Sequence, residues 1–532
     1  MSTTGTAQSV ISTTETFFEA FLVDNYKFID INECFFYMNS VISQDYEIKK
    51  WIIPVSAEDV FLRVKGMFYD DVYDDSYERL LMGYIINLSD DDRAKIFYKN
   101  NIIEFTRRHK NILKLYDELF SSVRNLYYIK TVDEIPSEFH DKFSSTPDNK
   151  KVKSYNNFVN NQYFMDPNSP PDTIKEILEK LNKYYMTYVY MPYMSFDRIH
   201  RLKYFQRKTV CIVDTDSNIL ALDQWVDFCR NEVLQGMYGR DDEHNKFIII
   251  NTLTYFITSA VSDILDQYGK HSNIPEEFRG RFGMKNEFYF DHLIIGKKKK
   301  RYISSIKLRE GNLMNPYKSD VKGFEFRKAT TSEEAKSIFD GIVKKHILES
   351  DVPNISGILY DLREFENRIR HSIQEGERTY LPLGNAKDLS AYKDPYSQQG
   401  VRGSIAWNLI YPDNQISFPS KVSILKLNIF SPEDIEDLRN VDIRIYNTII
   451  QEIFGSPIKE IASKGLQVIA IPSNSRIPEW CQPYIDYNTV INNIISQFKG
   501  VLDVFGINCP EVGKQIKSVN RKTKKFSNVV RF

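Results

Sequence analysis

The sequence predicts an α+β fold. Apolar residues recur at helical spacing from about Glu15 to Tyr128 and again over residues 241–268. Two other stretches, 208–223 and 286–308, each place two short apolar runs on either side of a polar turn, which is typical of an antiparallel strand pair. The chain has 532 residues, 42% of them hydrophobic, which is enough to bury the cores of about two to four domains.

The overall composition excludes several classes of protein. The net charge of -1 gives no global basic signature, so any binding of nucleic acid must depend on local patches. The five cysteines form no CxxC pair, which argues against a zinc site or a disulfide framework and fits a reducing, intracellular setting. We find no signal peptide at the start and no apolar run near the ~20 residues of a membrane helix, and we expect no membrane partner.

The first third of the chain is predicted to be mainly helical. Residues 1–14 are rich in Ser and Thr, and we expect them to be disordered. In the mainly helical region 15–171, Ser89 precedes three aspartates, a pattern that predicts a helix N-terminus. Residues 135–172 are rich in Pro, Ser and Asn and predict a loop-dominated joint, after which a helix starts at Asp172.

The first strand pair carries two acidic residues in its turn, within the sequence DTDS. Asp214 and Asp216 are two residues apart, so in extended backbone both carboxylates face the same side. Two like charges held side by side repel each other unless a cation bridges them, and carboxylate oxygens suit Mg²⁺. The alternative is a plain turn, since Asp and Ser favour turns through local hydrogen bonds.

The second strand pair encloses a run of basic residues, "GKKKKRY" over residues 296–302. Such a run is commonly a solvated face or a localisation signal. Its position between two strand-like runs, with Tyr302 at the end, instead favours a surface that follows a phosphate backbone. Shortly after it, "DVKGFEFRK" contains Gly323, which permits close backbone approach.

These three motifs, in this order, resemble those of the family B DNA polymerases, particularly the polymerases of large DNA phages. The chain has DTDS at 214–217, KKRY at 299–302 and KGFE at 322–325. Glu287 matches the acidic lead-in to the second motif, and the segment 398–408 resembles a thumb element with an Arg-Gly pair. The resemblance covers roughly residues 197–507.

The resemblance implies a right-hand polymerase fold with an antiparallel palm sheet, a helical fingers-side region and a helical thumb. The expected domains are a disordered N-terminus at 1–14, a fingers-side region at 15–171, a palm with the DTDS hairpin and the KKRY element at 172–330, a thumb at 331–510 and a basic flexible tail at 511–532. A helix in the thumb is expected to start with Thr331 or Ser332 as its cap.

The resemblance also implies a role for individual residues. Asp214 and Asp216 would be the catalytic carboxylates that bind Mg²⁺, and Glu325 would lie near them. The DNA-binding residues implied are Lys299, Lys300, Arg301, Tyr302, Lys322 and Arg402. Two divalent ions would activate the primer hydroxyl and stabilise the pyrophosphate leaving group.

Several features of the family are missing from the sequence. The first palm motif, DxxSLYP, is absent, and its nearest acidic stretch, residues 68–80, looks like an acidic surface loop. The fingers segment 156–164 has Asn156 where the nucleotide-binding lysine belongs. Asp30 and Glu33 have the wrong spacing for the metal pair of a proofreading exonuclease. We therefore interpret the chain as the C-terminal part of a split polymerase, whose other chain supplies the exonuclease and the first palm aspartate.

The predicted function is that of a polymerase subunit extending a DNA primer in complex with this second chain. The other expected partners are primer–template DNA and deoxynucleoside triphosphates. For the basic tail we favour a disordered segment that attracts DNA in general, and the alternative is a peptide that binds a sliding clamp. The expected location is the cytoplasm of an infected host cell or a virus-associated replication site. Alternatives are a non-catalytic DNA-binding or structural subunit of a replication complex, or an RNA polymerase or reverse transcriptase that uses the acids at 69–75.

Overall fold

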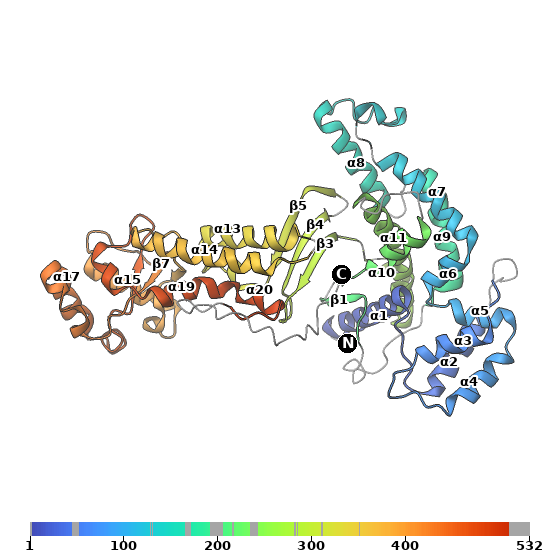
Figure 1. Cartoon of the computed structure of the whole chain (residues 1–532), viewed down its shortest axis with the longest axis horizontal. Coiled ribbons are helices and arrows are strands. Elements are labelled where there is room, and N and C mark those ends of the chain that lie inside the picture. Colours follow the sequence, from blue (N-terminus) through green and yellow to red (C-terminus); the bar gives the residue numbers. More distant parts are fainter. Residues whose placement is uncertain are drawn as a thin grey trace. The chain divides into compact units, whose positions relative to one another are not determined.

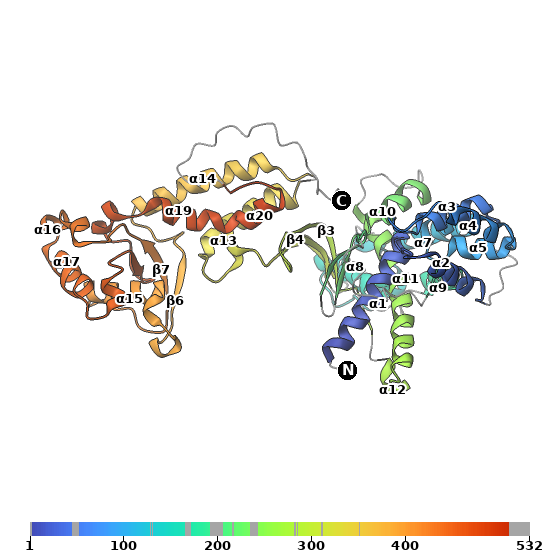
Figure 2. The same cartoon turned by 90° about the horizontal axis from the view of Figure 1, so that it is seen from below.

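The structure is a computed structural model that describes residues 3–44, 53–127, 129, 131–164, 172–191, 206–214, 217–234, 243–280, 283–284, 286–309, 312–350 and 352–509. The chain divides into two compact units (Figures 1 and 2). The first unit contains Met1–Tyr289 and Leu308–Met314, and the second contains Phe290–Lys307 and Asn315–Arg531. Each unit has its own hydrophobic core.

The first unit is mainly helical. Its helices and strands are α1 (Thr3–Val23), α2 (Ile31–Ile42), α3 (Ala57–Gly66), α4 (Tyr77–Ile86), α5 (Asp90–Tyr98), α6 (Ile102–Arg108), α7 (Lys110–Tyr127), α8 (Asp148–Phe164), α9 (Asp172–Tyr184), β1 (Val210–Val213), β2 (Asn218–Leu220), α10 (Asp223–Phe228), α11 (Glu243–His271) and α12 (Glu276–Arg279). Single π-helical turns at Tyr185–Val189 and Cys229–Val233 extend α9 and α10. The helix predicted to start at Asp172 and the one predicted over 241–268 are both present.

Local signals in the sequence correctly mark where several helices begin. The Ser89 hydroxyl accepts a hydrogen bond from the Asp92 amide and caps α5, as the sequence predicts. Asp30 caps α2 by accepting from the amide of Glu33, which gives both residues a structural role at a helix start.

The expected disorder of residues 1–14 is wrong, because α1 starts at Thr3. The C-terminal half of this helix is buried in the core, where Phe17 and Phe21 stack with ring centroids 5.0 Å apart. In Figures 1 and 2, α1 and α11 lie side by side. Burial of one end stabilises the helix more than its Ser/Thr-rich start destabilises it.

The expected loop-dominated joint over residues 135–172 is also wrong in its middle part. Helix α8 occupies 17 of these residues. Tyr155 is fully buried on this helix, and its ring meets the rings of Phe139 and Phe143 edge-on. This aromatic packing outweighs a polar local composition.

Three strands form one sheet, in which they follow each other in chain order: β3 (Phe288–Ile295), β4 (Tyr302–Arg309) and β5 (Asn312–Lys322). The first two are the strand pair predicted around the basic run, and β5 was not predicted. Most of β3 and β4 belongs to the second unit, and their outer ends belong to the first. The sheet therefore runs through the boundary between the units.

The rest of the second unit mixes helices with short strands, as expected. Its elements are α13 (Glu333–Val343), α14 (Ile355–Gln374), β6 (Leu383–Ala386), α15 (Gln399–Ile410), β7 (Ser420–Lys426), α16 (Leu438–Val441), α17 (Ile443–Thr448), α18 (Lys459–Ala462), β8 (Val468–Ile471), α19 (Tyr487–Ile495) and α20 (Lys499–Val504). The strands β6, β7 and β8 form an antiparallel sheet with β7 in the centre. Ser332, not Thr331, caps α13 by accepting from the Ala335 amide.

Helices from the two ends of the second unit pack together. In Figure 2, α14 and α19 lie side by side although more than a hundred residues separate them in the chain. The ring of Phe498, which precedes α20, stacks on Phe339 of α13 with centroids 5.3 Å apart. This packing brings the last described helices back to the start of the unit.

The observed units do not end where the expected domains end, because the boundary falls inside the predicted palm range 172–330. The expected palm and thumb limits stay predictions, and the tail 511–532 lies outside the described residues. We expected no apolar run as long as a membrane helix. Among the helices described, however, the stretch Ile248–His271 has the length and composition to cross a membrane. Most of it is buried in the core, and a core helix passes the same test.

Candidate active site

The two strands predicted around DTDS pair as an antiparallel hairpin, and Asp214 and Ser217, the first and last residues of DTDS, adjoin them. Strand β1 pairs with β2 in the register Val213 opposite Asn218 and Ile212 opposite Ile219. The amide of Asp214 donates to the carbonyl of Ser217 at 2.9 Å, which closes the turn. Asp214 is half-buried at the end of β1, whereas Thr215 and Asp216 lie outside the described residues.

The base of this hairpin is held by bonds between its two strands. The amide of Ala221 donates to the Thr209 carbonyl at 2.7 Å, and the Thr209 hydroxyl donates to the Ala221 carbonyl at 2.6 Å. The register shifts between Val210 and Ile212, so that Cys211 is an extra residue in β1. Such a bulge bends the strand and redirects the side chains beyond it.

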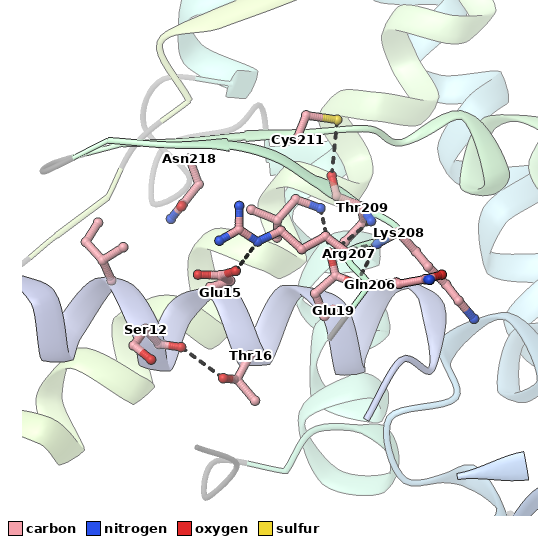
Figure 3. A network of polar contacts seen from close by, with 12 residues as sticks. Ser12, Glu15, Thr16, Glu19, Gln206, Arg207, Lys208, Thr209, Cys211 and Asn218 are labelled. Atoms are coloured by element: carbon pink, nitrogen blue, oxygen red, sulfur yellow. Dashed lines mark hydrogen bonds and ion pairs between the residues drawn. The ribbon is translucent and has the colours of Figure 1, made fainter. Parts of the chain in front are cut away.

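Helix α1 supports the hairpin through Glu19, which is completely buried (Figure 3). Its Oε1 accepts from the amides of Thr209 and Val210 at 3.0 and 2.7 Å. The amide of Lys208 donates to both carboxylate oxygens, at 3.1 and 2.9 Å. Three successive backbone N–H groups thus converge on one carboxylate, an arrangement that holds anions well.

Two further residues of α1 contact the same hairpin. Glu15 lies one turn before Glu19 and forms an ion pair with Arg207 (Figure 3). Burial raises the pKa of the Glu15 carboxyl, and the charge of Arg207 opposes this shift. The Asn218 amide nitrogen lies 3.4 Å from the Thr14 hydroxyl oxygen, so α1 touches both β1 and β2.

The basic run forms the turn between β3 and β4. The amide of Gly296 donates to the carbonyl of Arg301 at 2.8 Å, and Lys300 has a φ of 59°. Lys297 through Lys300 are exposed, which suits a surface for phosphates. The strands on either side hold these cations in one place.

The KGFE sequence packs directly against this basic turn. Gly323 has a φ of +75°, and a Cβ there would lie 2.5 Å from the Lys300 carbonyl oxygen. A side chain at this position is therefore excluded both by backbone conformation and by space. Only glycine lets the two motifs come together.

Charged contacts join the same two motifs. The Arg301 Nη2 lies 3.1 Å from the Glu325 Oε1, and Lys328 forms a second ion pair with Glu325. Hydrogen bonding to Lys328, with the charge of Arg301, lowers the pKa of Glu325. Glu325 thus positions the Arg301 guanidinium beneath the turn.

Tyr302 and Lys322 meet through a shared carboxylate. The Tyr302 hydroxyl donates to Asp320 Oδ2 at 3.1 Å, and Lys322 Nζ lies 3.7 Å from the same oxygen. The Lys322 ammonium also lies 5.3 Å from the centre of the Tyr302 ring. The structure therefore brings together Arg301, Tyr302, Lys322 and Glu325, which the sequence predicts as site residues.

Of the other predicted site residues that the structure describes, Lys299 and Lys300 lie in the basic turn itself, Arg402 lies on α15 and Asp214 follows β1. Arg402, on α15, donates to the carbonyls of Tyr396 and Ser397 at 3.0 and 3.1 Å. Asp214 belongs to the first unit and Glu325 to the second, so their expected proximity stays a prediction.

A metal site is not complete within the part of the chain that the structure describes. No group of three or more His, Cys, Asp or Glu side chains there could hold a metal ion. Asp214 offers one oxygen ligand at the end of a supported strand, and Asp216 lies outside the described residues. An oxygen donor at this place fits Mg²⁺, which binds proteins through one or two carboxylates.

Glu19 and Glu15 were not predicted as site residues. A signal was present, since the segment "FFEAFLV" places a glutamate within an apolar run. A buried charge of this kind needs a partner, but the sequence does not say which one. The acidic stretch 68–80, by contrast, is a loop as far as Ser76 and then the first turn of α4, with Asp70 and Asp71 exposed in the loop.

A comparison with models of protein families finds a match over residues 62–516 to the family described as "Divergent Family B DNA polymerase". The match includes the DTDS hairpin, the basic turn and the KGFE sequence. No curated protein matches the chain.

Proposed function

Because the chain belongs to the divergent family B DNA polymerases, we propose that it provides the catalytic hairpin and the primer-binding surface of a template-directed DNA polymerase. The observation that carries this proposal is Asp214, held at the end of a hairpin by backbone pairing and by a buried carboxylate. A hairpin fixed in this way suits a carboxylate that must be placed accurately.

The proposed reaction joins a deoxynucleoside triphosphate to the 3′ hydroxyl of a DNA primer. Mg²⁺ held by Asp214 and Asp216 would supply the positive charge that such phosphoryl transfer requires. Asp214 contributes an oxygen ligand from a fixed strand end. Because positioning and electrostatic stabilisation account for most of the catalysis in this chemistry, the rigidity of the hairpin matters as much as the charge.

The basic turn is proposed to hold the primer strand. Lys299 and Lys300 present exposed ammonium groups, while Arg301 and Lys322 are oriented by Glu325 and Asp320. Contacts of this type set the position of DNA without reading its sequence. A polymerase needs this property because it must move along any template.

We further propose that a second chain completes the active site. The sequence lacks the DxxSLYP motif of the family. The acidic stretch that comes closest to this motif in sequence, residues 68–80, has Asp70 and Asp71 in an exposed loop. The other chain would contribute the first palm aspartate and the exonuclease. The alternative is a non-catalytic DNA-binding subunit. The description of the family as divergent is compatible with this alternative, because a divergent member can lack activity.

Primer extension by the purified chain tests these proposals. The assay contains a primed DNA template, deoxynucleoside triphosphates and Mg²⁺, and DNA binding is measured in the same samples. Binding without extension, followed by extension once a partner chain is added, supports the split polymerase. Binding that no partner chain converts into extension supports the non-catalytic subunit. Extension by the chain alone would refute the need for a second chain.

The variant Asp216→Asn identifies the catalytic carboxylate. In the form of the polymerase that extends the primer, we expect it to abolish extension and to leave DNA binding nearly unchanged, because it removes a metal ligand and not a phosphate contact. Asp227→Asn, an exposed carboxylate on α10, is the matched control and should keep full activity. Equal loss of binding and extension in Asp216→Asn would show that the carboxylate is structural.

A further inference from the structure

The start of β1 has an unusual backbone arrangement. In a regular strand, successive N–H groups point to opposite sides. Here the N–H groups of Lys208, Thr209 and Val210 all point to the carboxylate of Glu19, at 2.7 to 3.1 Å (Figure 3). The chain is therefore bent at the entry to β1, and the bend is built around one side chain.

The carboxylate of Glu19 has a complete set of partners. Besides the three backbone amides, its Oε2 accepts from the side-chain amide of Asn25 at 2.5 Å. The same Asn25 nitrogen donates to the Gln206 carbonyl at 2.9 Å, so it ties the segment before β1 to the loop after α1. A buried carboxylate with several donors is a strong and specific anchor.

The backbone amides that bind Glu19 lie at the start of the catalytic hairpin. Val210 is the first residue of β1, and Asp214 follows the last. One extra residue of β1, Cys211, lies between Val210, which binds Glu19, and Ile212, which pairs with Ile219 of β2. The bend at 208–210 therefore decides the direction of the short strand on which Asp214 lies.

From this geometry we infer that Glu19 is a positioning residue for the polymerase reaction, acting through the backbone of β1 to place Asp214. The inference rests on the proposed function. It adds that the first helix of the chain, α1, is part of the active-site support and not only of the core. Glu19 itself does not contact substrate or metal.

The substitution Glu19→Gln tests the inference with little change of shape. The NH₂ group of glutamine would take the place of one carboxylate oxygen. Because this group donates and does not accept, it cannot form the hydrogen bonds that this oxygen accepts from the surrounding N–H groups. We expect amide hydrogen exchange over residues 208–214 to become about tenfold faster or more, because the local opening of this segment becomes easier. Unchanged exchange would overturn the inference, whatever the activity of the chain.

Binding of Mn²⁺ to the full-length chain gives a second readout that needs no catalysis. The site is identified as the binding lost in Asp214→Asn. We expect Glu19→Gln to weaken this binding severalfold, and primer extension by the active form to require correspondingly more Mg²⁺. Equal Mn²⁺ affinity in wild type and Glu19→Gln would refute the inference. Equal Mn²⁺ binding in wild type and Asp214→Asn would instead refute the proposed function.

A matched control separates positioning from stability. Glu366 on α14 is also a buried glutamate, paired with Arg363, and belongs to the second unit. Glu366→Gln should lower thermal stability without changing the exchange at 208–214 or the Mn²⁺ affinity. If Glu19→Gln does not fold, Glu15→Gln, whose partner Arg207 is partly exposed, should shift both readouts in the same direction by a smaller factor.

Discussion

Substitution of Gly323 by Ala should damage the basic surface in a way that the structure makes measurable. The φ of +75° alone costs an alanine about 1 to 2 kcal/mol. The added Cβ would also lie 2.5 Å from the Lys300 carbonyl oxygen and 2.8 Å from the Arg301 Cγ. Because a backbone atom must move to relieve the first contact, we expect a further cost of about 1 to 3 kcal/mol.

Gly506 provides the matched control for this experiment. Its φ is +71°, and a Cβ there would meet nothing within 4 Å. Gly506→Ala should therefore show only the conformational cost, about 1 to 2 kcal/mol. The difference between the two variants isolates the close approach of KGFE to the basic turn.

Two assays follow the effect of Gly323→Ala. Thermal unfolding should show a midpoint lowered by about 2 to 4 °C for each kcal/mol lost in a unit of this size. DNA binding, followed by fluorescence anisotropy, should weaken more in Gly323→Ala than in Gly506→Ala, because Lys300 and Arg301 are displaced. Equal stability and equal DNA affinity in the two variants would show that the contact between the motifs has no functional importance.

Three further predictions concern charged groups. Neutralising Lys299 and Lys300 should reduce the slope of log affinity for DNA against log salt by about one for each lost phosphate contact, and an unchanged slope would remove the turn from the interface. Burial lowers the pKa of Lys99 to about 7, so between pH 7 and 10 the unfolded chain binds more protons than the folded chain. The free energy of unfolding of wild type, measured by urea titration, should therefore rise over this pH range relative to that of Lys99→Met. A difference between the two free energies that does not change with pH would contradict the lowered pKa. Substitution of Asp70 and Asp71 by Ala should leave primer extension unchanged, whereas its loss would favour the reading as an RNA polymerase or reverse transcriptase.

Local signals predicted much of the fold correctly. Ser89 and Ser332 cap helices because a side-chain oxygen and a backbone amide three residues later meet through local geometry alone. The two strand pairs were evident because apolar runs on either side of a polar turn favour hairpins. The order of DTDS, KKRY and KGFE also sufficed to recognise the polymerase family, since the motifs depend only on residue types along the chain.

Predictions that relied on composition were less successful. Residues 3–14 and the middle of 135–172 have polar compositions typical of loops, yet both contribute to helices. In each case the helix is stabilised by burial of particular aromatic side chains: Phe17 and Phe21 stack in α1, and the rings of Phe139 and Phe143 pack against Tyr155 of α8. A composition averaged over a local window contains no information about such contacts.

The family, the hairpin that leads to Asp214 and the basic turn at 297–301 could all be recognised from residue types along the chain. How these parts are supported depends on long-range packing: Glu19 binds amides 189 to 191 residues further along the chain, and Glu325 binds Arg301 across a contact that Gly323 permits. A buried carboxylate must find hydrogen-bond donors, but any segment that reaches it can supply them. The choice of partner is therefore made by packing of the whole chain and not by the residues near the carboxylate.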